Sequence, residues 1–267
     1  MIRHSAAIFA ALTASSFAAE VRSGNATAEW ITTSANYQAG QPVYTALRLK
    51  IDPGWHTYWV NPGEGGMKAS FKWQLPEGWK VDEPQYPVPI RFFTGDLPGF
   101  GYENEVILPV RVTPPAKSTE AADLSVKISW LTCDDSACVP GDAEVTLHLV
   151  PGEPAATDDD TAINSAIFQV PKTLQGAVLK VEEKESVLTL NLKVPPFPGF
   201  DATKCEVFPK SVSTVDDGKP IQFTHSEDGW TATATKSEYL EGPVKDLTIV
   251  LAGKGTPFPM ELTWKSE

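Results

Sequence analysis

Cysteine chemistry is the first chemistry that the sequence suggests, because two of its three cysteines lie close together. Cys133 and Cys138 are separated by four residues, whereas Cys205 is far from both. Residues 130–140 read WLTCDDSACVP, so a strand-like pattern leads to the first cysteine and a short acidic turn follows it. A turn of this length can bring the two Cα atoms within disulfide distance. The segment therefore predicts a cysteine pair.

The residues alone leave two interpretations of this pair open. As a structural staple, a disulfide that closes so short a loop contributes only about 2 kcal/mol. As a redox pair, its thiols would be poor free nucleophiles, because Asp134 and Asp135 disfavour a thiolate and no helix begins here. We therefore hypothesise that the pair reacts mainly when docked on a partner whose own low-pKa cysteine attacks or leaves.

Two aromatic segments flank glycine-rich turns. Residues 54–66 read GWHTYWVNPGEGG; no Lys-Ser/Thr follows, as a phosphate loop requires, and His56 has no second histidine at ligand spacing. Core and turn packing is the favoured interpretation there. Residues 92–102 read FFTGDLPGFGY and predict either a contact surface or lid, or a loop that covers the end of a sandwich.

Motifs for other chemistries are missing from the sequence. It contains no G-x-S-x-G, no H-E-x-x-H and no P-loop. Cys205 lies in a strand-like pattern between Lys204 and Glu206, where a buried free thiol is expected. No cofactor and no metal site is predicted.

Composition and charge narrow the class of protein. The chain has 267 residues, 42% of them hydrophobic and 21% charged, which is an ordinary balance for packed domains. Its formal net charge of -12 argues against binding to nucleic acid or to an anionic membrane surface, since both need clustered Lys and Arg.

The amino-terminal residues predict export. Arg3 and His4 precede an apolar run over residues 6–12, and Ser16 and Ala18 fit the small-x-small rule for cleavage. Residues 1–19 are therefore expected to be a secretory signal peptide. No later stretch is apolar enough to span a bilayer, so we expect a soluble, exported protein without direct membrane insertion.

Strand patterns dominate the chain after this segment. Apolar and polar residues alternate, as in a half-buried antiparallel sheet, over residues 43–51, 71–75, 106–112, 124–130 and 145–149. Proline and glycine mark turns between these segments. Several short strands with regular turn signals favour a β-sandwich over residues 20–151.

A second domain is predicted after the polar, acidic break that follows Pro151. Thr157 or Asp158 is expected to cap a short helix that Pro171 stops. The alternating segments that follow predict another β-sandwich, so the second domain covers residues 152–267. The fold class is thus all-β, with two tandem sandwiches and a short linking helix.

Taken in order, these motifs resemble the amino-terminal periplasmic domain of DsbD, a protein-disulfide reductase, and of its ScsB-like relatives. The matching pieces, which cover roughly residues 25–150, are GWHTYWVNPG at 54–63 with Gly66, PVP at 87–89, GYENEV at 101–106, WLTC at 130–133 and CVP at 138–140. The second half resembles the companion β domain of ScsB-like proteins through VFP at 207–209 and the closing strands.

The resemblance implies immunoglobulin-like domains and a periplasmic thiol–disulfide exchange module. Cys133 and Cys138 would take electrons from a membrane-embedded donor and pass them to thioredoxin-fold partner proteins, with Cys138 attacked first. It also implies an aromatic cap loop over the pair, which would fall on Phe100 and Tyr102. The expected supporting residues, all from the matching motifs, are His56, Tyr58, Trp59 and Trp130.

Two departures from the family pattern bear on these expectations. DsbD continues into a membrane domain and a thioredoxin-like domain, whereas this sequence ends at Glu267. The protein is therefore expected to work with its donor in trans, or with a different electron donor. The cysteine spacing is also one residue shorter than in the best-known member. Two alternatives stay open: a non-enzymatic envelope binding or assembly module with a structural disulfide, and a Cu(I)-handling protein, since thiols bind Cu(I) well.

Overall fold

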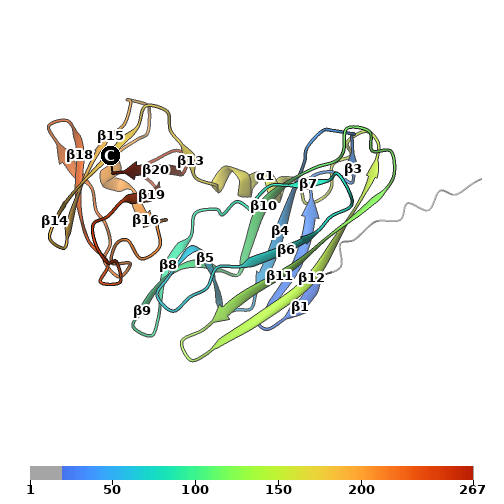
Figure 1. Cartoon of the computed structure of the whole chain (residues 1–267), viewed down its shortest axis with the longest axis horizontal. Helices are drawn as coiled ribbons and strands as arrows, with labels where there is room; N and C mark the ends of the chain where they lie inside the picture. Colours follow the sequence, from blue (N-terminus) through green and yellow to red (C-terminus); the bar gives the residue numbers. More distant parts are fainter. Residues whose placement is uncertain (1–19, 267) are drawn as a thin grey trace, which may run out of the picture.

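Two β-domains joined by a short helix make up the chain (Figure 1). The structure is a computed structural model that describes residues 20–266. The predicted signal peptide, residues 1–19, lies outside the described residues. The predicted all-β fold class with a linking helix is confirmed.

The first domain contains two sheets. Its strands are β1 (Val21–Ser23), β2 (Ala26–Thr32), β3 (Asn36–Tyr37), β4 (Val43–Ile51), β5 (His56–Gly63), β6 (Ser70–Gln74), β7 (Lys80–Val81), β8 (Ile90–Thr94), β9 (Leu97–Glu103), β10 (Glu105–Thr113), β11 (Ala122–Cys133) and β12 (Cys138–Pro151). One sheet has the order β1-β2-β4-β10-β7. The other has the order β3-β12-β11-β5-β9-β8, and β6 pairs with β11.

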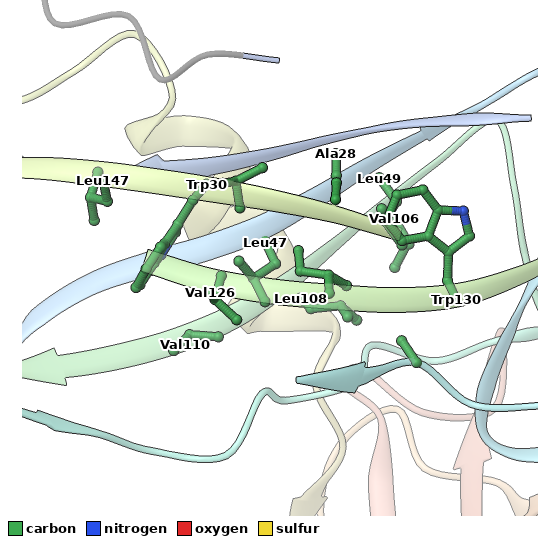
Figure 2. Packing of buried hydrophobic residues seen from close by; sticks show 14 of the residues in the cluster. Ala28, Trp30, Leu47, Leu49, Val106, Leu108, Val110, Val126, Trp130 and Leu147 are labelled. Carbon is green, nitrogen blue, oxygen red and sulfur yellow. The ribbon is translucent and has the colours of Figure 1, made fainter. Parts of the chain in front are cut away.

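The core of this domain follows from the alternation seen in the sequence. Leu124, Val126, Ile128 and Trp130 point to one side of β11 and are fully buried, packing against residues of the facing sheet such as Leu47 (Figure 2). Large apolar side chains on one face of each sheet hold the two sheets together by burying that surface.

Glycine is required opposite Trp130. Gly141 is the direct cross-strand partner of Trp130, and a Cβ at Gly141 would lie 2.6 Å from the indole ring. The ring therefore covers the β12 backbone at this point. This contact fixes the alignment of the two strands three residues before they reach the cysteines, because a slip by one residue would move Trp130 out of the core.

Helix α1 (Asp160–Gln169) links the domains. Its N-cap is Asp159, not Thr157 or Asp158 as predicted. Thr157 is used otherwise: its hydroxyl donates to the Thr32 carbonyl at the end of β2. Asp159 forms an ion pair of 2.5 Å with Arg48 on β4, so a contact distant in the sequence sets the start of the helix. The helix ends two residues before Pro171, as expected.

The second domain is a smaller pair of sheets. Its elements are β13 (Lys172–Thr173), β14 (Val178–Lys184), β15 (Val187–Lys193), the 3-10 helix η1 (Ala202–Lys204), β16 (Glu206–Pro209), β17 (Thr224–Ser226), β18 (Gly229–Thr235), β19 (Asp246–Ala252) and β20 (Met260–Lys265). The sheet orders are β13-β20-β19-β16 and β14-β15-β18-β17. Leu188, Leu190, Ile249 and Leu251 lie fully buried in their shared core.

An aromatic contact joins the two domains. Phe208 on β16 packs edge-on against Trp59 on β5 and Phe100 on β9, with ring centroids 6.5 and 6.1 Å apart. All three side chains belong to the buried cluster of the first domain, so the second domain contributes to that core. Such edge-to-face pairs add to the stabilisation from burial alone.

A buried polar cluster lies beside this aromatic contact. The amide of Asn61 on β5 is fully buried and donates to the Pro209 carbonyl at 2.9 Å and to the Asp217 carboxylate at 3.3 Å. Arg91 on β8 donates to the Asp217 carbonyl and lies 4.6 Å over the Phe100 ring. Burial raises the pKa of Asp217 to about 6, against the opposing effects of Asn61 and Arg91.

This cluster predicts a pH-dependent contribution to stability. The folded pKa of Asp217 lies above its unfolded value, so between about pH 4 and 6 the folded state binds more protons and its free energy of unfolding falls as pH rises. The full loss corresponds to about 3 kcal/mol at most. Asp217→Asn should remove this slope in chemical unfolding measured by tryptophan fluorescence, whereas Asp246→Asn, at an exposed position, should keep it. An unchanged slope in Asp217→Asn would contradict the assignment.

Candidate functional site

Cys133 and Cys138 form a disulfide at the end of the β11–β12 hairpin, where Cys133 is the last residue of β11 and Cys138 the first of β12. The two residues are direct cross-strand partners, and their Cα atoms are 4.1 Å apart. The hairpin end and the β8–β9 hairpin lie at the same end of the first domain (Figure 1). The pair that the spacing predicts is therefore present.

The two cysteines differ in access to solvent. Cys133 is fully buried, whereas Cys138 is exposed. A partner thiolate approaching from solvent meets Cys138 first, and Cys133 is the sulfur that would leave. Since attack on a disulfide depends on which sulfur can be reached, the burial pattern gives the pair a direction.

The turn between the cysteines is held by Asp134. Its carboxylate accepts hydrogen bonds from the Ser136 amide at 2.8 Å, the Ser136 hydroxyl at 2.8 Å and the Ala137 amide at 2.7 Å. These bonds, those from Ser136 first, hold the pKa of Asp134 below its ordinary value. A charged carboxylate next to the disulfide disfavours negative charge on either sulfur.

His56 lies next to Cys133 on the other side. It is the first residue of β5 and the direct cross-strand partner of Cys133. Its Nε2 atom lies 3.1 Å from the Thr94 hydroxyl and 3.4 Å from the Tyr58 hydroxyl, and its ring lies over Phe92 with centroids 3.9 Å apart. His56 thus contacts Tyr58 and two residues of β8, Phe92 and Thr94.

Phe100 and Tyr102 do not lie in an exposed loop, which corrects the expectation from the sequence. Both are buried in β9. The strand register puts Tyr102 opposite Thr57, so Tyr102 points to the core side, away from the cysteines. Its hydroxyl donates to the Pro87 carbonyl at 2.7 Å. These positions do not cover the disulfide.

Two other residues of this aromatic segment, Phe92 and Thr94, contact His56, which is the cross-strand partner of Cys133. Sequence reasoning placed them in the correct segment but did not single them out. The sequence signal for Phe92 was Gly99. β9 has no side chain at this position, and the Phe92 ring occupies the space, 2.5 Å from where a Cβ would be.

Trp130 and Trp59 lie fully buried in the core of the first domain. Trp130 fixes the hairpin register at Gly141, and Trp59 packs at the contact between the domains.

Cys205 is buried, and its thiol donates to the Asp201 carbonyl at 3.6 Å. Burial raises the pKa of Cys205 to about 12, with the Asp201 carboxylate acting in the same direction.

Residues 20–266 contain no group of three or more His, Cys, Asp or Glu side chains placed to hold a metal ion. Over the same residues, no helix has both the length and the apolar character needed to cross a membrane.

A family model for the N-terminal domain of the thiol:disulfide interchange protein DsbD matches residues 27–150. The first domain belongs to this family. The match spans both cysteines, His56 and the β8–β9 hairpin, so the disulfide of this DsbD N-terminal domain lies inside the region that defines the family.

Solved structures extend the comparison to the second domain. The N-terminal periplasmic domain of ScsB from Proteus mirabilis is similar over 90% of this chain and 93% of its own, with a TM-score of 0.65 and 20% identity, which shows a shared fold. The C-terminal domain of the Streptococcus agalactiae AgI/II polypeptide BspA aligns over 88% of this chain and 96% of its own, with a TM-score of 0.20 and 10% identity. No curated protein sequence matches the chain.

The unequal burial of the thiols predicts unequal alkylation in the reduced, folded protein. Cys138 should react with iodoacetamide at least about tenfold faster than Cys133, and Cys205 should react slowest because it is buried and its pKa is raised. Peptide mass spectrometry over time measures each site. In denaturant the three rates should converge; equal rates for Cys133 and Cys138 in the folded protein would contradict the assigned direction.

Proposed function

We propose that the chain is a periplasmic thiol–disulfide exchange protein, a protein-disulfide reductase, whose first domain passes electrons through Cys133 and Cys138. The donor is a membrane-embedded protein acting in trans, and the acceptors are thioredoxin-fold proteins. The proposed organisation is a signal peptide at residues 1–19, the redox domain at 20–151 and a second sandwich domain at 152–267.

The observation that carries this proposal is the half-exposed disulfide itself. A disulfide that only staples a hairpin gains nothing from exposing one sulfur, and β11 and β12 are already paired along all of β11. Here Cys138 is exposed and its disulfide partner Cys133 is buried. Two-step exchange needs this arrangement, in which one sulfur is attacked from solvent and the other leaves. The family of the first domain supports the same chemistry.

Exchange proceeds in two balanced steps. To load the protein, a donor thiolate attacks Cys138 Sγ, the Cys133–Cys138 bond breaks and Cys133 Sγ leaves as a thiolate. The donor's second thiolate then attacks the donor's first sulfur in the mixed disulfide, and Cys138 leaves as a thiolate. The donor dithiol has become a disulfide, and two electrons reside on the Cys133–Cys138 dithiol, which reduces an acceptor disulfide by the reverse sequence.

The acidic surroundings suit a reductant that must survive among oxidants. Asp134 carries its charge beside the pair, and Asp135 is exposed in the same turn. Both disfavour a free thiolate, so the reduced pair should react slowly with small disulfides and faster with a protein that covers the turn and brings its own activated cysteine.

Trapping tests this function directly. In a Cys205→Ala background, Cys133→Ser leaves only Cys138. Its thiolate should displace thionitrobenzoate from a purified thioredoxin-fold protein whose single nucleophilic cysteine carries that group as a mixed disulfide, and so form a stable mixed disulfide between the two proteins. The matched variant Cys138→Ser leaves only the buried Cys133 and should trap far less, by at least about tenfold. Non-reducing electrophoresis measures the complex.

Absence of any mixed disulfide with Cys133→Ser, under conditions in which a small disulfide still modifies Cys138, would overturn the proposal. The disulfide would then be a structural staple in a binding module.

A further inference from the structure

Four residues on neighbouring strands form a row across the sheet at the disulfide. Cys138 on β12 pairs with Cys133 on β11, Cys133 pairs with His56 on β5, and His56 pairs with Glu103 on β9. Direct cross-strand partners point to the same face, with Cβ atoms about 4.5–5.5 Å apart. The imidazole of His56 therefore lies beside the buried sulfur of Cys133, and the carboxylate of Glu103 lies on its far side.

The orientation of His56 is fixed. The side chain is only 6% exposed, its ring lies over Phe92, and its Nε2 atom is within hydrogen-bond distance of the hydroxyls of Thr94 and Tyr58. With the ring proton on Nε2, these hydroxyl oxygens can accept it. Nδ1 then keeps a free lone pair and has no hydrogen-bond partner in residues 20–266.

The charged groups around His56 set its protonation. Burial lowers the pKa of His56 below its ordinary value, while the carboxylates of Glu103, Asp135 and Asp134 oppose this effect. At neutral pH the imidazole is therefore mostly uncharged and able to accept a proton. The same three carboxylates then stabilise the imidazolium that forms.

We propose that His56 accepts the thiol proton of Cys133 in the step that resolves the mixed disulfide. This role rests on the proposed exchange function and deepens it. Cys133 needs such a group because it is fully buried from solvent, and His56 is its direct cross-strand neighbour on β5.

The step balances as follows. After Cys138 has attacked a partner disulfide, the mixed disulfide joins Cys138 Sγ to the partner. Cys133 gives its proton to His56 Nδ1, and Cys133 Sγ attacks Cys138 Sγ. The Cys133–Cys138 bond forms, the bond to the partner breaks, and the partner sulfur leaves with the electron pair as a thiolate. The imidazolium then releases its proton to solvent past the exposed Glu103.

The step can be observed without any protein partner. Reduced protein in a Cys205→Ala background is mixed with excess dithiobis-nitrobenzoate, a chromogenic disulfide. Attack by Cys138 releases one coloured thiolate, and resolution by Cys133 releases a second. The fast and slow phases of absorbance therefore report the two cysteines separately.

His56→Gln should slow the second phase by about 100-fold and leave the first phase unchanged. In the wild-type protein, the second-phase rate should rise with pH up to an inflection below the ordinary histidine pKa and then level off. In His56→Gln it should instead keep rising across neutral pH, because only direct ionisation of the thiol remains. The matched control His148→Gln, at an exposed histidine on β12 of the same domain, should behave as wild type.

Glu103→Gln provides a second variant that does not threaten the fold, because Glu103 is exposed. Removing its charge should move the inflection of the second phase to lower pH, since Glu103 raises the pKa of His56. An unchanged second phase and pH profile in His56→Gln, or an inflection unmoved by Glu103→Gln, would overturn the role of His56. Failure to trap thioredoxin-fold proteins, with both effects present, would overturn the exchange function alone.

Discussion

The register of the β11–β12 hairpin is the constraint on which the site depends. Every residue of β11 is paired with one of β12, from Ala122 to Cys133, and the pair Trp130–Gly141 holds this alignment in the core. A slip of one residue would separate the cysteines and turn the buried row of β11 toward solvent. The disulfide is thus placed by the packing of apolar side chains several residues away.

The same register explains why the site is asymmetric. The hairpin turn carries Cys138 to the surface, whereas β5 continues the sheet on the other side of Cys133 and buries it. The carboxylates in the turn and at Glu103 disfavour negative charge on the two sulfurs. The imidazole of His56, which is uncharged and fixed in orientation, is the proposed proton acceptor beside them. Low intrinsic reactivity combined with one exposed sulfur favours exchange with a docked protein over exchange with small thiols.

Local patterns in the sequence were sufficient for β4, β6, β10, β11 and β12, for a second β domain, for the linking helix and for the cysteine pair, because period-two alternation and short turns leave a local signal. The segments that form β5, β8 and β9 were read as turn and loop segments, because their glycines and prolines hide the alternation. They were insufficient where distant contacts decide. Arg48 fixes the helix start at Asp159, and β-strand parity turns Tyr102 into the core. Asn61, read only as part of a turn motif, meets Asp217 of the other domain. No local pattern encodes these contacts between residues far apart in the chain.

The reduction potential of the Cys133–Cys138 pair distinguishes a disulfide that takes part in exchange from a structural one. Purified protein without its first 19 residues is equilibrated in glutathione or dithiothreitol buffers of known potential, and the free thiols are counted with Cys205 replaced by alanine. For a pair that exchanges electrons with partner proteins, we expect a potential of roughly -270 to -180 mV. A potential well below about -300 mV would mark a structural disulfide and contradict the exchange function.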